Sequence, residues 1–151
     1  MSYNVYKVRY TLTIPDPSMP SPRYHTVIFV ATSKDGSGIV HHVIGDITSG
    51  MTYSTRDEGQ PETSSTFFSK DFLGAISIND YPHEIDRVLR AQPPPPKQKH
   101  FHIDTMRMEQ QKPDGTFYQP GEDRPPMIKC TEWIENQAIP ALYESGVLRS
   151  S

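Results

Sequence analysis

One cysteine and a small group of histidines carry the clearest chemistry in this sequence. Cys130 is the only cysteine among the 151 residues. It begins an apolar stripe with the spacing of one helix face, at positions 130, 133, 134, 138, 141 and 142. A helix start offers unpaired N–H groups and a partial positive charge, both of which favour a thiolate. Cys130 is therefore a candidate nucleophile, and the alternative from position alone is a cysteine that packs in the core.

The histidines supply a candidate base. His25 stands at the start of the most apolar run of the chain, residues 24–31, and His41 and His42 lie in the next run, 39–44. A histidine beside a thiol can accept its proton. Adjacent strand residues point to opposite faces, so only one of His41 and His42 can share the side of His25 and orient its ring. We expect the other to face solvent or to pack on the second face.

The elements that must position these residues are strands in the first half. Alternation predicts a half-buried strand over 5–12, and the β-branched and aromatic run 24–31 predicts a central strand buried on both faces. Asp35-Gly36 predicts a hairpin into the strand 39–44. A further strand is expected at 50–54. The pattern does not decide the structure of 67–78.

The second half predicts two helices and a hairpin. Asn79 to Pro82 has the residues of a helix start, and the final helix from Cys130 is expected to bend at Pro140 and to end at Gly146. Strands are expected at 101–108 and 116–118, joined by a turn at 113–115. We expect one domain over 1–151, with loops at 15–23, 55–66, 93–99 and 119–127.

Composition narrows the class of protein. The net charge is −3, and the 15 Lys and Arg residues are scattered among 18 acidic ones, which argues against a nucleic-acid binder. No apolar stretch reaches the length of a membrane span, and the first residues do not resemble a signal peptide. We expect a cytoplasmic protein with a free thiol and no cofactor. His100 and His102 would share a strand face, but no further ligands complete a zinc set, so no metal site is expected.

Two parts of the chain resemble circularly permuted papain-like proteins. Tyr24–Val30 and Gly38–His41 are similar to the first half of these folds, and Lys129–Ile134 is similar to the second, where Lys129 stands in place of a usual asparagine. The order, histidine before cysteine, also agrees. Two branches are close, namely the lecithin–retinol acyltransferase-like group and the PPPDE-type desumoylating or deubiquitinating peptidases. The second has a similar His-Thr-x-Ile-x-Val strand and an Ile-Pro pair like Ile139-Pro140.

This resemblance implies an α+β fold, in which an antiparallel sheet packs against a C-terminal helix that starts at Cys130, in a permuted papain-like (NlpC-like) arrangement. It implies a cysteine-dependent hydrolase or acyltransferase that acts on an amide, isopeptide or ester through a thioester on Cys130. The substrate would be a small molecule, a lipid, or a peptide or isopeptide. His25 would be the general base and His41 the orienting residue. Trp133 is expected in the core or along the substrate cleft, and the other candidate substrate contacts are Tyr24 and His42.

Two alternatives stay open at this stage. The chain could be a binding or interaction domain that keeps the scaffold without its chemistry, an alternative that Lys129 and the proline run Pro93–Pro96 favour. It could also be a small-molecule biosynthetic enzyme that uses other chemistry in the same cleft.

Overall fold

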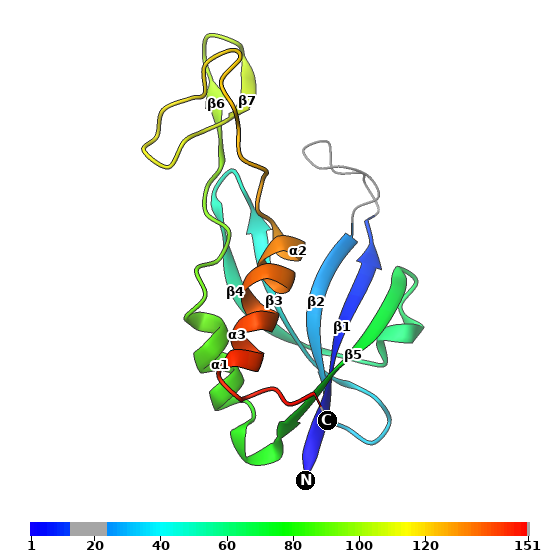
Figure 1. The fold of residues 1–151 in the computed structure, drawn as a ribbon. Coiled ribbons are helices and arrows are strands. Elements are labelled where there is room, and N and C mark those ends of the chain that lie inside the picture. Colours follow the sequence, from blue (N-terminus) through cyan, green and yellow to red (C-terminus); the bar gives the residue numbers. More distant parts are fainter. Residues whose placement is uncertain (13–23, 151) are drawn as a thin grey trace.

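The centre of the fold is an antiparallel sheet of five strands (Figure 1). A computed structural model describes residues 1–12 and 24–150, so the expected loop at 15–23 lies outside the described residues. The strand order is β4-β3-β2-β1-β5. The bounds are β1 Ser2–Thr11, β2 Tyr24–Ala31, β3 Gly38–Asp46, β4 Gly50–Glu58 and β5 Phe67–Ser77.

The hydrophobic pattern places these strands. The alternating run predicted at 5–12 is β1, and the run 24–31 is β2, in which every residue from Thr26 to Val30 is buried. The strand predicted at 50–54 continues to Glu58. The prediction of a loop over 55–66 is therefore wrong for its first residues, which belong to β4. A single 3₁₀ turn, Pro61–Thr63, follows it. Residues 67–77 form the edge strand β5.

The sheet is curled, and both of its faces bury apolar residues. The Tyr10 hydroxyl on β1 lies 3.5 Å from a Glu58 carboxylate oxygen on β4, although two strands separate them in the sheet. The larger core lies between the sheet and the helices and contains Val5, Ile28, Val30, Val43, Ile76, Ile85, Leu89, Trp133, Ile134 and Leu142. A smaller core on the other face contains Val8, Tyr10, Val27, Phe29 and Val40.

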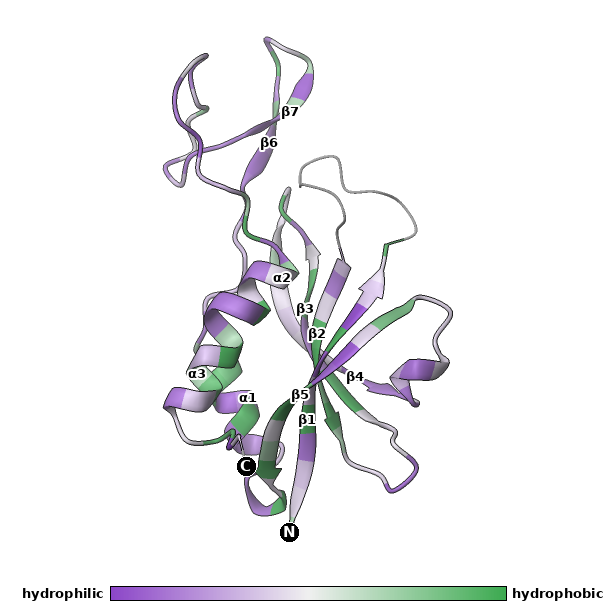
Figure 2. Ribbon diagram, turned by 45° about the vertical axis from the view of Figure 1, so that its right-hand side comes forward, coloured by the Kyte–Doolittle hydropathy of each residue, from purple (hydrophilic) through white to green (hydrophobic). Residues whose placement is uncertain are grey.

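Two helical segments cover one face of the sheet, with their hydrophobic residues toward it (Figure 2). The first is α1, His83–Arg90, which begins later than predicted because Ile78–Asp80 forms a separate 3₁₀ turn. The second begins at Cys130, as predicted, and contains α2 Cys130–Trp133, a π-helical turn Ile134–Ala138, and α3 Ile139–Glu144.

The π-helical turn is how this helix accommodates Pro140. Proline has no N–H to donate to the carbonyl four residues earlier, and its ring crowds that carbonyl. Here the Ile139 N–H donates to the Ile134 carbonyl, one residue further back than in an α-helix. The predicted disturbance is therefore a widened turn before Pro140. The helix ends as expected at Gly146, whose φ is 78°.

Residues 97–128 form an arm that projects beyond the sheet (Figure 1). Its strands are β6 Lys99–His102 and β7 Arg107–Gln110, so the strand predicted over 101–108 is wrong, because a turn falls inside it. The turn predicted at 113–115 is present, but the strand predicted at 116–118 is wrong, because only an isolated bridge between Gln111 and Phe117 forms there. Residues 119–127 contain no helix or strand. Among the described residues no helix has both the length and the hydropathy to cross a bilayer.

Candidate active site

The end of the sheet that lies next to the start of α2 contains a pocket lined by both His25 and Cys130. Its volume is about 350 Å³, within the range of small-ligand sites. Most of its wall is apolar, with Lys129 and Asp46 as charged exceptions. The apolar lining residues are Leu12, Tyr24, Val43, Ile44, Ile47 and Met51.

Cys130 is held at the first position of the helix by a capping arrangement. Lys129 has an extended backbone, with φ −128° and ψ −159°, so the helix starts at the cysteine itself. The Lys129 N–H donates to the Glu132 carboxylate at 2.8 Å, as in a capping box. The Lys129 carbonyl accepts from the Trp133 N–H at 3.0 Å. The Cys130 thiol is consequently fixed at the pocket wall, with 9% of the residue exposed.

A pair of threonines fixes this helix start against the start of β2. The hydroxyls of Thr26 and Thr131 are 2.8 Å apart, and the Thr131 hydroxyl also lies 3.3 Å from the Tyr24 carbonyl oxygen. The Cys130 Sγ lies 3.9 Å from the same carbonyl. These contacts hold the cysteine against the start of β2. The His25 side chain, on the opposite face of β2 from Thr26, lines the same pocket. We call the Thr26–Thr131 pair the threonine clamp.

His25 is oriented by His42. The Nε2 atom of His25 and the Nδ1 atom of His42 are 3.1 Å apart and share one hydrogen. The pairing of β2 with β3 explains the choice. Phe29 is opposite Val40, and continuing this register by two residues puts His42 opposite Val27, on the face of β2 that also carries His25. The expectation that His41 orients His25 is therefore corrected. His41 points to the helix-covered face.

The His41 ring is engaged elsewhere, and it is 1% exposed. Its Nδ1 lies 2.5 Å from the Tyr53 hydroxyl, which donates in turn to Asp86 at 2.8 Å. The tyrosine oxygen therefore accepts the Nδ1 hydrogen, and Nε2 accepts from the Tyr81 hydroxyl at 2.8 Å. This chain of hydrogen bonds joins β3, β4 and α1, so His41 has a structural role in which it holds these elements together.

Both histidines of the pair are neutral at physiological pH. Burial, followed by the positive charge of Arg56, lowers the pKa of His25 below its ordinary value. Burial is also the main cause that lowers the pKa of His42 to about 4, with the neighbouring His25 next. A neutral His25 that donates Nε2–H to His42 leaves its Nδ1 lone pair free to accept a proton.

The other candidate substrate contacts separate into two groups. Tyr24 lines the pocket, where its ring stacks on Phe68 with centroids 4.3 Å apart. Trp133 does not line it, since its side chain is fully buried in the larger core against Tyr53. Within 1–12 and 24–150, no group of three or more His, Cys, Asp and Glu side chains is arranged to hold a metal ion.

The threonine clamp and the apolar lining of the pocket were not predicted from the sequence. The clamp leaves no sequence signal before the contact between β2 and α2 is known, because Thr26 reads as an ordinary strand residue and Thr131 as a first-turn residue. His42 could have been chosen over His41 from the hairpin register, had the six-residue connection 32–37 been assigned correctly.

Comparison with known proteins gives a family but no described relative. Searches against curated proteins and against solved structures found no match. One family model, described as a family of unknown function (DUF6540), matches residues 5–149. The match includes both strands of the histidine pair and the whole helix that begins at Cys130. The chain belongs to this family of unknown function, DUF6540.

Proposed function

We propose that this protein is a thiol hydrolase or acyltransferase in which Cys130 is the nucleophile, His25 the general base and His42 the orienting residue. The observation that carries the proposal is the His25–His42 hydrogen bond at the wall of a pocket that also contains the Cys130 thiol. A nucleophile, a base and a residue that fixes the base are the three parts of a catalytic triad. The burial of His42 supports its role as a fixed, neutral acceptor.

The proposed first step is attack by the Cys130 sulfur on a substrate carbonyl carbon. His25 takes the thiol proton on Nδ1, and the resulting imidazolium keeps its Nε2–H bond to His42. The carbonyl π electrons move to the oxygen, and the negative charge falls near the first N–H groups of α2. Those groups have no acceptor within the helix, so the Cys130 N–H can stabilise the oxyanion.

In the second step the tetrahedral intermediate collapses to a thioester. The bond to the leaving alcohol or amine breaks, and that group leaves with the proton held by His25. Water or a second alcohol or amine then attacks the thioester, with His25 accepting its proton, and the acid, ester or amide is released as the thiol forms again. The reaction needs no cofactor and returns every proton to its starting place.

The likeness to permuted papain-like proteins supports the same conclusion from a different direction. The order is histidine strand, second histidine strand, then a cysteine at a helix start, and these elements converge on one pocket. The family model spans all three elements. The chain departs from that pattern at Lys129, whose charge lies at the pocket in place of an amide side chain.

Alkylation of Cys130 tests the catalytic pair directly, because the chain has no other thiol. The rate of modification by iodoacetamide is measured by intact mass between acidic and alkaline pH, for the unaltered protein, His25→Ala and His100→Ala. Loss of His25 is expected to lower the neutral-pH rate at least about tenfold and to move the profile to higher pH. The control His100→Ala, on the arm, should leave the profile unchanged.

The thioester itself is the second readout. Incubation with activated acyl esters should add the acyl mass to the unaltered protein, hydroxylamine should remove it, and Cys130→Ser should prevent turnover. A thiol whose rate is indifferent to His25, with no acyl adduct, would refute the proposal and favour a binding domain on this scaffold.

A further inference from the structure

The base of the arm lies between the two sides of the pocket that contains Cys130. On one side Ile47, in the turn between β3 and β4, and Met51, at the start of β4, form part of the apolar wall. On the other side the arm returns to the sheet and enters α2 at Cys130 (Figure 1). The segment 95–99, at the start of the arm, makes hydrogen bonds to both sides.

Backbone hydrogen bonds hold the wall to this segment. The Ile47 carbonyl accepts hydrogen bonds from the N–H groups of Gln98 and Lys99, at 2.7 Å and 3.1 Å. The Met51 N–H donates to the Pro95 carbonyl at 2.8 Å. Pro95 belongs to the run of four prolines, whose rings fix φ and disfavour the helical region for the residue before each one. The wall is therefore fixed to a stiff part of the chain.

The side chain of Gln98 holds the other side of the pocket. Its Nε2 donates to the Ile128 carbonyl and its Oε1 accepts from the Ile128 N–H, each at 2.7 Å. Nε2 also donates to the Pro96 carbonyl at 3.2 Å, and the Gln98 carbonyl accepts from the Gln111 N–H at 2.8 Å. An uncharged amide offers two donor hydrogens and an acceptor, which an ionised carboxylate of the same size does not.

These bonds make Gln98 a bridge across the pocket. Its N–H fixes Ile47 in the wall, and its side chain fixes Ile128, two residues before Cys130. The threonine clamp holds the same helix start to β2, so it fixes the thiol relative to the strand of His25 and not relative to the wall. The distance between the Cys130 thiol and the wall consequently depends on Gln98.

We propose that Gln98 is a positioning residue that sets the width of the pocket between the Cys130 thiol and the wall of Ile47 and Met51, and thereby the acyl groups that the thiol accepts. This inference rests on the function proposed above, because an acyl group on Cys130 would occupy that space. An acetyl group offers the wall little apolar surface. A longer apolar acyl group gains about fourfold in rate for each methylene that the wall covers.

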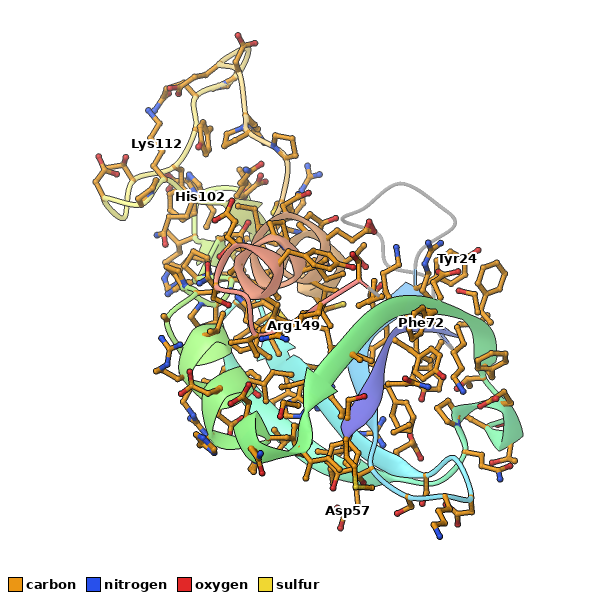
Figure 3. All side chains as sticks on the ribbon, turned by 60° about the horizontal axis from the view of Figure 1, so that its bottom comes forward. Tyr24, Asp57, Phe72, His102, Lys112 and Arg149 are labelled. Carbon is orange, nitrogen blue, oxygen red and sulfur yellow. The ribbon has the colours of Figure 1, made fainter. Side chains whose placement is uncertain are left out.

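Acylation by p-nitrophenyl acetate and p-nitrophenyl octanoate tests the proposal. The rate of p-nitrophenol release, above that of Cys130→Ser, gives kcat/KM for the unaltered protein, Gln98→Ala, Gln98→Glu and the control Gln111→Ala. The control loses a side-chain hydrogen bond within the arm but keeps its backbone bond to Gln98. Its neighbour Lys112 lies in the arm, away from Tyr24 at the pocket (Figure 3). Melting curves establish that each variant is folded.

The unaltered protein and Gln111→Ala should prefer octanoyl to acetyl by at least about tenfold, and Gln98→Ala should cut this preference at least about fivefold. Gln98→Glu should behave like Gln98→Ala at neutral pH and recover the preference towards about pH 5, because only a protonated acid can donate to the Ile128 carbonyl. An unchanged preference in Gln98→Ala, or an equal loss in Gln111→Ala, would overturn the inference and leave the proposed function intact. Alkylation that is indifferent to His25 would instead refute the proposed function, and this inference with it.

Discussion

The buried His41 makes the stability of this fold sensitive to acid, and His41→Phe isolates its contribution. Burial lowers the pKa of His41 to about 4 against the opposing effect of the Asp86 carboxylate, while a histidine in the unfolded chain titrates at about 6.5. Between these values the unfolded chain binds a proton that the folded protein does not bind. The free energy of unfolding therefore falls as the pH falls through this window.

The size of the effect follows from the two pKa values. Each pKa unit corresponds to about 1.4 kcal/mol. At a pH below both pKa values, the difference between about 6.5 and about 4 therefore lowers the free energy of unfolding by about 3.4 kcal/mol. Between about pH 8 and about pH 5 the loss from His41 alone is about 2 kcal/mol. Phenylalanine fills a similar volume without titrating. At neutral pH it should cost about 1–3 kcal/mol, because the Tyr81 hydroxyl loses its acceptor.

Urea unfolding at several pH values, followed by the fluorescence of Trp133, measures both quantities. Trp133 is the only tryptophan and is fully buried. His41→Phe should start less stable at neutral pH but lose about 2 kcal/mol less than the unaltered protein on acidification to about pH 5. The control is His83→Phe, at an exposed position on α1, which should keep the pH dependence of the unaltered protein. Parallel curves for His41→Phe and the unaltered protein would refute the reasoning.

Two further predictions concern the site. Thr131→Val removes the hydroxyl of the threonine clamp at nearly constant volume, so we expect the neutral-pH alkylation rate of Cys130 to fall about three- to tenfold while the melting temperature changes by only a few degrees. An unchanged rate would mean that the clamp does not position the thiol. Arg56→Gln removes the cation that helps lower the pKa of His25 and releases Glu58 from its 2.7 Å ion pair. Loss of this cation raises the pKa of His25, so the acid limb of the alkylation profile should move to higher pH, and a shift to lower pH would contradict this account.

The sequence predicted the elements whose side-chain periodicity is strong and failed where local signals compete. The β2 strand and the helix from Cys130 were recognised because a long apolar pattern outweighs single residues. The turn at 103–106 was missed because alternation continues through it, and it contains neither glycine nor proline. Met106 takes the left-handed position there, which no residue rule would assign to methionine.

For the site, the nucleophile and base candidates could be predicted from residue type and position, but the partner of the base could not. His25 and Cys130 could be selected because each stands at the start of a strongly patterned element, and element starts meet at sheet ends. His42 could not be separated from His41 without the register of β2 and β3. The threonine clamp depends on a tertiary contact over 105 residues of chain, which no local pattern contains.

The two adjacent histidines of β3 show why the register of this hairpin cannot slip. The side-chain period of a strand is two, so moving β3 by one residue would place His41 beside His25 and His42 among the helices. His41 would then lose both tyrosine hydroxyls. His42, moved to the helix-covered face, would become a buried imidazole without hydrogen-bond partners. The same slip would turn Val40 and Val43 away from the cores that they fill. The His41 network therefore specifies the register that gives His25 its partner, and the structural histidine secures the geometry of the proposed catalytic one.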